Sequence, residues 1–305
     1  APPAEPPTAP LAPALAALRR AVSEQAGFPL LLCSRRDAEC LAFARDPELG
    51  RIGQQGPVTP DHVIRTKRLP LLGRDLDAYA SAYRDYFDRQ ADAPGVRVGI
   101  GYDGAVLIPG AGFEQVQVID TMVEGVHFPE DTPAADIGYR VVAVNLSDIA
   151  AMGAEPRWMT LALTVPRSDE QWIAAFASGL FEAASEFGVA LVGGDMTSGE
   201  RLVATVHISG EVAPGKALLR SGAQAGDTIF VSGTLGDAAA GLELLGHGKK
   251  DDYLTQRFLR PDARVQIGRQ LSGRASAAID VSDGLLGDLK KLLAASGVGA
   301  VVDIE

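Results

Sequence analysis

Aspartate residues follow short apolar segments at several places in the chain, each beside glycine or another small residue. Carboxylates at strand ends commonly converge above a sheet, where α/β proteins bind their ligands. Grouped carboxylates repel one another unless cations lie among them, and Mg²⁺ bridges carboxylates to substrate phosphates. The pattern therefore indicates magnesium-dependent phosphate chemistry. The segments are GIGYDGA with Asp103, VIDTMVEGVHF with Asp120, NLSDIAAMG with Asp148, LVGGDMT with Asp195, and AIDVSDGL with Asp280 and Asp283.

Each of these segments also has a plainer interpretation, since aspartate is favoured in turns and at helix N-caps. Asp148 lies within a helical pattern, where Ser147 and Asp148 could break or cap the helix. Asp280 and Asp283 could flank one turn after a buried strand, with Ser282 and Gly284 exposing backbone donors. The pattern of an aspartate beside small residues recurs in five segments. This recurrence favours metal binding over the alternative that the segments are five unrelated turns.

The sequence around the other polar candidates for the site contains fewer recognisable patterns. His127 is either a structural histidine or a phosphate or ring contact, and Arg220 is either a solvated side chain or a phosphate ligand. The sequence GTLG at 233–236 precedes a helix but matches no nucleotide-binding loop, so we interpret it as structural. Cys33 and Cys40 lack the spacing of a metal site or a disulfide framework.

The composition excludes several classes of protein. Of the 305 residues, 47% are hydrophobic and 22% are charged, which is typical of a globular protein. The formal net charge of -11 opposes binding to nucleic acid, which requires a basic surface. No apolar stretch approaches the length of a membrane span, and the start lacks a secretory signal, so we expect a cytoplasmic protein.

The chain divides into four segments by composition. We expect a flexible Pro- and Ala-rich leader at 1–20, a mainly helical segment at 21–94 that includes a helix at 75–89, and two mixed α/β domains at 95–212 and 213–305. The first α/β domain is predicted to contain strands at 115–120, 159–165, 189–192 and 202–212, and helices at 137–152 and from Ser168 to Gly188. The second is predicted to begin with strands at 228–232 and 277–282 around a helix from Asp237, and we expect that a strand partner for 301–305 is missing.

Taken in order, these segments resemble thiamine-monophosphate kinase, a family of the AIR-synthetase-like superfamily. The resemblance covers about residues 96–305 and includes NLSDIAAMGAEPRWMTLALT, LLRSGAQAGD and VSGTLGDAAAGL. It implies a two-domain α/β (α+β type) fold, with the second domain incomplete. It also implies phosphorylation of thiamine monophosphate to thiamine diphosphate by direct transfer from Mg²⁺-ATP, usually in a homodimer. Tyr102 departs from the family, which usually has a second aspartate there.

The resemblance also assigns roles to the candidate residues. It implies Mg²⁺ ligation by the six aspartates, ATP contacts from Gly194, Asp195, Arg220 and Ser282, and a thiamine phosphate contact from His127. These residues fit the chemistry, because phosphoryl transfer requires positioning and charge neutralisation more than a protein nucleophile.

The first part of the chain resembles a different family. LGRIGQQGPVTPDHVIRTKRLPLLGRD and YASAYRDYFDRQ, within residues 11–92, are similar to the segment that joins the two halves of bifunctional rhamnulose-phosphate aldolase/alcohol dehydrogenases. The segment carries neither an HxH metal pair nor a GxGxxG loop, so neither activity is implied. Two alternatives therefore remain beside the kinase, namely another AIR-synthetase-like ATP-dependent enzyme and an inactive fusion with this fragment.

Overall fold

The computed structural model describes residues 11–26, 81, 93–99, 104–167, 169–249 and 251–302. The chain forms two compact units, of which the first contains residues 1–92 and 100–103 and the second contains residues 93–99 and 104–305. In the first unit, helix α1 spans Leu11–Ala26 and so crosses the expected end of the leader. The helix expected at 75–89 lies outside the described residues, apart from Ser81, which is helical.

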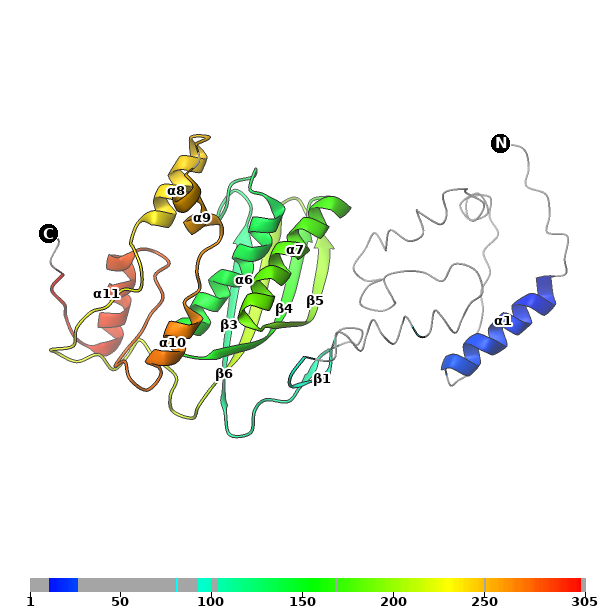
Figure 1. The fold of residues 1–305 in the computed structure, drawn as a ribbon, viewed down its shortest axis with the longest axis horizontal. Helices are drawn as coiled ribbons and strands as arrows, with labels where there is room; N and C mark the ends of the chain where they lie inside the picture. The colour runs from blue at the N-terminus through cyan, green and yellow to red at the C-terminus, as the bar shows by residue number, and fades with distance from the viewer. Residues whose placement is uncertain are drawn as a thin grey trace. The chain divides into compact units, whose positions relative to one another are not determined.

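A four-stranded sheet forms the centre of the second unit (Figure 1). Its strands are β3 (Glu114–Val123), β4 (Glu155–Val165), β5 (Ala190–Ser198) and β6 (Val203–Val212), in the spatial order β3-β6-β4-β5. Only β4 and β5 are parallel neighbours. A short antiparallel hairpin of β1 (Val96–Val98) and β2 (Val106–Leu107) precedes β3.

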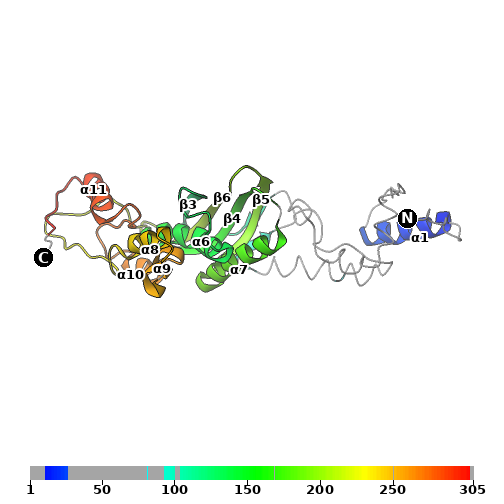
Figure 2. The same ribbon diagram turned by 90° about the horizontal axis from the view of Figure 1, so that it is seen from above.

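Helices α6 (Ala134–Ala151) and α7 (Glu170–Phe187) cover the same face of this sheet (Figure 2). Gly188, with a φ of 68°, ends α7 in the left-handed conformation, which confirms the predicted stop. The predicted start is one residue too early. Asp169, not Ser168, is the N-cap, because its carboxylate accepts hydrogen bonds from the Gln171 and Trp172 amides.

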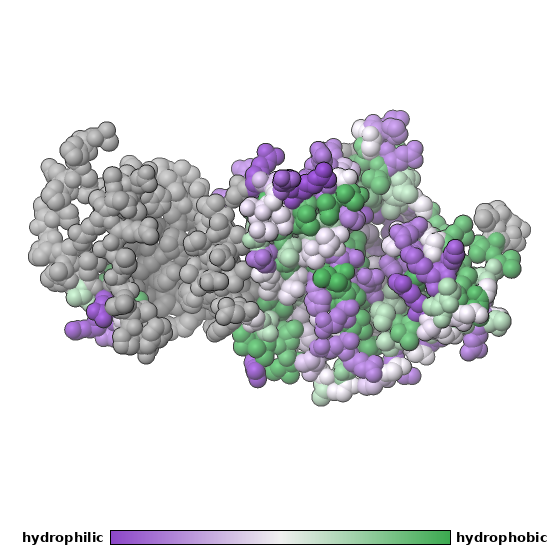
Figure 3. All heavy atoms as spheres, turned by 180° about the vertical axis from the view of Figure 1, so that it is seen from behind, coloured by the Kyte–Doolittle hydropathy of each residue, from purple (hydrophilic) through white to green (hydrophobic). Residues whose placement is uncertain are grey.

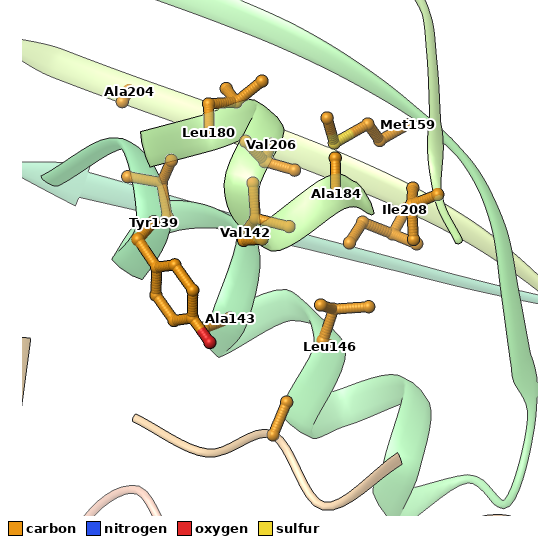
Figure 4. Packing of buried hydrophobic residues seen from close by; sticks show 14 of the residues in the cluster. Tyr139, Val142, Ala143, Leu146, Met159, Leu180, Ala184, Ala204, Val206 and Ile208 are labelled. Carbon is orange, nitrogen blue, oxygen red and sulfur yellow. The ribbon is translucent and has the colours of Figure 1, made fainter. Parts of the chain in front are cut away.

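The core lies between these two helices and the sheet (Figure 4). Alternate residues of the strands point into it, including Ala204, Val206 and Ile208 of β6, as the sequence pattern predicts. Two glycines allow α6 and α7 to approach each other closely. A Cβ on Gly138 would lie 2.0 Å from the Phe176 carbonyl oxygen, and one on Gly179 would lie 1.8 Å from the Ala135 carbonyl oxygen.

The described residues beyond β6 form four helices, which are α8 (Asp237–Gly246), α9 (Asp252–Leu259), α10 (Val265–Leu271) and α11 (Leu285–Ser296). The prediction of strands at 228–232 and 277–282 is wrong, since neither is a strand in the structure. A strand requires a hydrogen-bonded neighbour, and these segments pair with no other strand among the residues that the structure describes. Phe230 is accordingly 89% exposed.

The strands and helices predicted for 95–212 are all present, and the mixed α/β fold class is confirmed. Seen from behind, the second unit shows hydrophilic and hydrophobic residues interspersed over the visible face (Figure 3). In the part of the chain that the structure describes, no helix is both long and apolar enough to cross a membrane.

Candidate functional site

Three of the predicted aspartates, Asp120, Asp148 and Asp280, come together in the folded chain, where the charge of Asp120 acts on both of the others. Burial raises the pKa of Asp148 to about 6, and the charges of Asp280 and Asp120 add to the shift, while Arg220 opposes it. The pKa of Asp280 is also raised, by burial first and then by the charges of Asp288 and Asp120, again against Arg220. These three carboxylates therefore form a negatively charged group, which we call the carboxylate cluster. The guanidinium of Arg220 lies close to it.

Backbone contacts at the end of α6 explain why these residues meet. Asp148 lies in the last turn of that helix. Just beyond it, the Met152 carbonyl accepts a hydrogen bond of 2.9 Å from the Leu218 amide, which places Arg220 close by. The Leu219 carbonyl in turn accepts one of 2.9 Å from the Ala278 amide, two residues before Asp280. The end of α6 thus anchors both later segments.

Helix α10 adds a direct contact to the same end of α6. A Cβ on Gly268 would lie 2.0 Å from the Ala150 carbonyl oxygen, so only glycine permits this approach. Since α10 leads into the segment of Asp280, its close packing helps fix the distance between Asp148 and Asp280.

A cavity of about 340 Å³ adjoins the cluster. It lies between strand β3, the end of α6 and the segment 278–280, and Asp148, Arg220 and Asp280 all line it. Gln115, Gln117 and Met152 line it as well, and no sequence pattern identified these three residues as part of a site. The cavity has a mixed lining of apolar and polar side chains and lies next to clustered negative charge, where a ligand that arrives with a cation can bind.

His127 lies near Asp120, one member of the carboxylate cluster. Its Nδ1 accepts a hydrogen bond of 3.0 Å from the Val123 amide, which orients the ring. Burial raises the pKa of Asp120, and the nearby His127 acts in the opposite direction. The histidine is exposed to solvent, so a ligand can reach it.

Asp195 lies away from the cluster, although the predicted site includes it. Asp120 shares its cross-strand row with Val206, Leu161 and Gly194, while Asp195 pairs with Ala162 in the next row. Side chains alternate along a strand, so Asp195 projects from the opposite face. Strands β3 and β5 are also three positions apart in the sheet, or about 14 Å at the usual strand spacing.

Gly194 has a steric reason to be glycine. A Cβ at this position would lie 2.2 Å from the Leu161 carbonyl oxygen on the neighbouring strand. The glycine therefore serves the pairing of β4 and β5, whatever ligand it also contacts.

The segment with Ser282 and Asp283 adopts a turn whose donors face inward. Both amides donate hydrogen bonds of 2.9 Å to the carboxylate of Asp288, so the expectation that Ser282 exposes its backbone donor is wrong. The Asp283 carboxylate is 70% exposed and accepts a bond from Lys291. Sequence reasoning missed Asp288 and Lys291, although an aspartate in the first helical turn after SDG is a recognisable capping signal. Asp103 and Tyr102 lie outside the described residues.

The donor set of the carboxylate cluster fits Mg²⁺. Among the residues of known placement, no group of three or more His, Cys, Asp and Glu side chains could hold a metal ion by itself. Mg²⁺ usually needs only one or two protein carboxylates, because it keeps several waters and takes its other ligands from phosphates. Desolvated carboxylates with raised pKa values suit such a cation, whose charge would stabilise their ionised form.

The raised pKa of Asp148 predicts a pH-dependent stability in the absence of metal. Between the ordinary value of 3.8 and about 6, the folded chain binds more protons than the unfolded chain, so its stability falls as pH rises through this range. Asp148→Asn removes this cost. Above about pH 6 the variant should be more stable by about 1–2 kcal/mol, after allowance for solvent screening at this half-buried group.

Thermal unfolding in EDTA between pH 5 and pH 8 measures this effect. The difference in midpoint between Asp148→Asn and the parent chain should widen toward pH 7 and shrink toward pH 5. A difference that stays constant over this range would contradict the assignment of the raised pKa to Asp148.

Family comparisons agree with the two parts of the chain recognised in the sequence. Residues 101–212 match the AIR synthase related protein, N-terminal domain, and residues 224–305 match the C-terminal domain of the same family. Residues 9–116 match the second domain of class II aldolases. The E. coli hydrogenase maturation protein HypE, at 21% identity and a TM-score of 0.58, shares the fold.

Individual relatives are more specific. Thiamine-monophosphate kinase of Salmonella typhimurium is 48% identical over 228 residues, which span 72% of this chain and 70% of the relative. The crystal structure of thiamine-monophosphate kinase from Stenotrophomonas maltophilia matches at 47% identity with a TM-score of 0.66, over 70% of this chain and 71% of that one. A structure of AaThiL complexed with AMPPCP and TMP matches at 31% identity and a TM-score of 0.59, over 75% and 73% of the two chains. The chain belongs to the thiamine-monophosphate kinase family of phosphotransferases.

Proposed function

We propose that this protein transfers the γ-phosphoryl group of ATP to the phosphate of thiamine monophosphate, giving thiamine diphosphate, in a reaction that requires Mg²⁺. The observation that carries the proposal is the convergence of Asp120, Asp148 and Asp280 with Arg220 beside a cavity of about 340 Å³. The relative that was solved with AMPPCP and TMP supports the choice of the two substrates.

In this proposal Mg²⁺ takes one or two of its ligands from the carboxylate cluster of Asp120, Asp148 and Asp280 and the rest from phosphates and water. Arg220 binds a phosphate of ATP. When bound, Mg²⁺ supplies positive charge that screens the nucleotide phosphates from the acceptor phosphate, which is itself an anion. Gly194 and Ser282 contact ATP, and Asp103 and Asp283 complete the metal ligands. Asp195, which projects from the other face of the sheet, contacts ATP and a metal ion apart from the carboxylate cluster. His127 meets the phosphate of thiamine monophosphate, which suits its place beside Asp120.

The residues of the chain bind and orient the two phosphates rather than attack them. Direct in-line transfer needs no covalent intermediate on the protein, and its rate depends on alignment and charge neutralisation. Arg220 suits this task because its guanidinium can grip two phosphate oxygens at once. Its attraction to Asp148 and Asp280 places it beside the cluster before any ligand binds.

The proposal is tested by incubating the full chain with ATP, Mg²⁺ and thiamine monophosphate and measuring thiamine diphosphate by chromatography. We expect product with thiamine monophosphate, and none when EDTA is present. Calorimetric titration with Mg²⁺ and AMPPCP separates the alternatives. Nucleotide binding without thiamine diphosphate would favour another AIR-synthetase-like reaction, and the absence of both would favour an inactive fusion.

We also propose the domain boundaries inferred from the sequence, with the kinase domains at 95–212 and 213–305 after the leader at 1–20 and the aldolase-like segment at 21–94. Strand β3 is at one edge of the sheet, and an edge strand suits the proposed homodimer. The cytoplasmic location remains a prediction.

A further inference from the structure

Asp288 is a buried carboxylate outside the predicted site, and it holds the turn that carries Ser282 and Asp283. It lies in the first turn of α11 with only 1% of its surface exposed. A buried carboxylate is costly unless it is paired and hydrogen-bonded. Here Oδ2 accepts bonds of 2.9 Å from the amides of Ser282 and Asp283, and Oδ1 accepts one of 2.8 Å from Lys291 Nζ.

These bonds outweigh the cost of burial. The ammonium of Lys291 and the two turn amides together donate three hydrogen bonds to a carboxylate that is only 1% exposed, an arrangement that favours its ionised form. Asp288 is therefore an anion whose partners are all parts of the same turn and helix. A carboxylate satisfied in this way restrains the backbone on which Asp280 and Asp283 lie.

Lys291 connects this buried anion to an exposed one. The same Nζ that contacts Asp288 also lies 2.7 Å from Oδ2 of Asp283, whose side chain is 70% exposed. The ammonium is thus shared between two carboxylates and offsets part of the charge of Asp283 in the absence of ligands. A divalent cation that binds Asp283 must compete with this ammonium for the same carboxylate.

We propose that Asp288 is a positioning residue for the phosphoryl-transfer site, where it fixes the Ser282–Asp283 turn and holds Lys291 as a resident cation against Asp283. The inference rests on the proposed function only in treating Asp283 as a metal ligand. Asp288 does not touch a substrate in this scheme. Asp288 acts through Ser282 and Asp283, in the way that residues hydrogen-bonded to metal ligands commonly orient those ligands.

The two halves of the proposal predict opposite effects on cation binding. Asp288→Asn keeps the shape of the side chain but removes its charge, so the turn amides lose a charge-assisted acceptor and Lys291 loses one of its two partners. We expect Mg²⁺ binding in the presence of AMPPCP to weaken by about 10- to 100-fold, the usual cost of losing an outer partner. Lys291→Met removes the competing ammonium and leaves the turn bonds intact. We expect Mg²⁺ binding to tighten by about 3- to 10-fold, since a like charge is removed from the site.

Hydrogen exchange provides a readout that is independent of metal and activity. In metal-free protein, exchange of the peptide spanning residues 278–289 should accelerate about tenfold or more in Asp288→Asn, because the amides of Ser282 and Asp283 lose a charged acceptor. Exchange there should accelerate less in Lys291→Met, which keeps both amide bonds to Asp288. Lys290→Met is the matched control, since Lys290 is the exposed neighbour of Lys291 on α11, and it should alter neither measurement.

Calorimetry and exchange on the full chain decide the matter. Equal Mg²⁺ affinity in Asp288→Asn and the parent chain would overturn the positioning role, and so would unchanged exchange. Weaker Mg²⁺ binding in Lys291→Met would overturn the competition with the ammonium. If the parent chain makes no thiamine diphosphate, the proposed function fails, yet the exchange experiment still tests the bonds from Asp288 to the turn.

Discussion

Asp148→Asn is expected to lower kcat/KM for Mg²⁺-ATP by about 100- to 1,000-fold, as the loss of one electrostatic partner of a transferring group commonly does. Asp148 is the member of the carboxylate cluster that both Asp120 and Asp280 influence, and it lines the adjoining cavity. Asparagine keeps the size of the side chain and removes the charge. Steady-state kinetics with varied Mg²⁺ measures the effect, and excess Mg²⁺ should restore only part of the rate.

The same substitution should stabilise the metal-free protein at neutral pH, so a loss of activity cannot be ascribed to unfolding. Asp252→Asn is a suitable control because it makes the same chemical change at an exposed position in the first turn of α9. The control should retain parental kinetics. If Asp148→Asn turns over at the parental rate, the carboxylate cluster is not the place where phosphoryl transfer depends on cations.

Gly179→Ala is expected to destabilise the second unit by at least about 2 kcal/mol, which corresponds to a fall of about 4–8 °C in the unfolding midpoint. Alanine normally stabilises a helix relative to glycine by up to about 1 kcal/mol, so the expected sign is the reverse of the helix propensity. The reason is the contact between α6 and α7. The new Cβ would lie 1.8 Å from the Ala135 carbonyl oxygen, and two packed helices would have to separate.

Gly246→Ala separates packing from propensity. Gly246 is the last residue of α8, and a Cβ there meets nothing within 4 Å. Thermal unfolding should therefore show an equal or slightly higher midpoint for this variant. If Gly179→Ala also raised the midpoint, the close approach of α6 and α7 would be incorrect.

The local pattern of the chain was sufficient to predict most elements of the first α/β domain. Apolar residues at helical spacing and the left-handed Gly188 determine α7 and its end, while alternation determines β6. These signals act over a few residues, so they can be read without knowing the rest of the fold. The N-cap shifted from Ser168 to Asp169 because both residues can cap and only the backbone geometry selects one.

Strand formation in the second domain could not be predicted in the same way. The segments 228–232 and 277–282 have the composition of strands. Composition gives only a preference for the extended conformation, and a strand also requires a neighbouring strand to pair with. No strand of the described chain pairs with them. Exposed apolar residues such as Phe230 and Val281 are the consequence.

By itself, the sequence determined which residue types were available for the chemistry, namely repeated aspartates beside small residues. It also determined the local element of Asp120, in a strand, and of Asp148, in a helix. Only the tertiary structure decided which of them meet. The strand order places Asp195 away from Asp120, whereas contacts at the end of α6 bring Asp148 and Asp280 together. The physical reason is that secondary structure follows from neighbours along the chain, while a site depends on packing between segments more than 100 residues apart, such as Asp148 and Asp280.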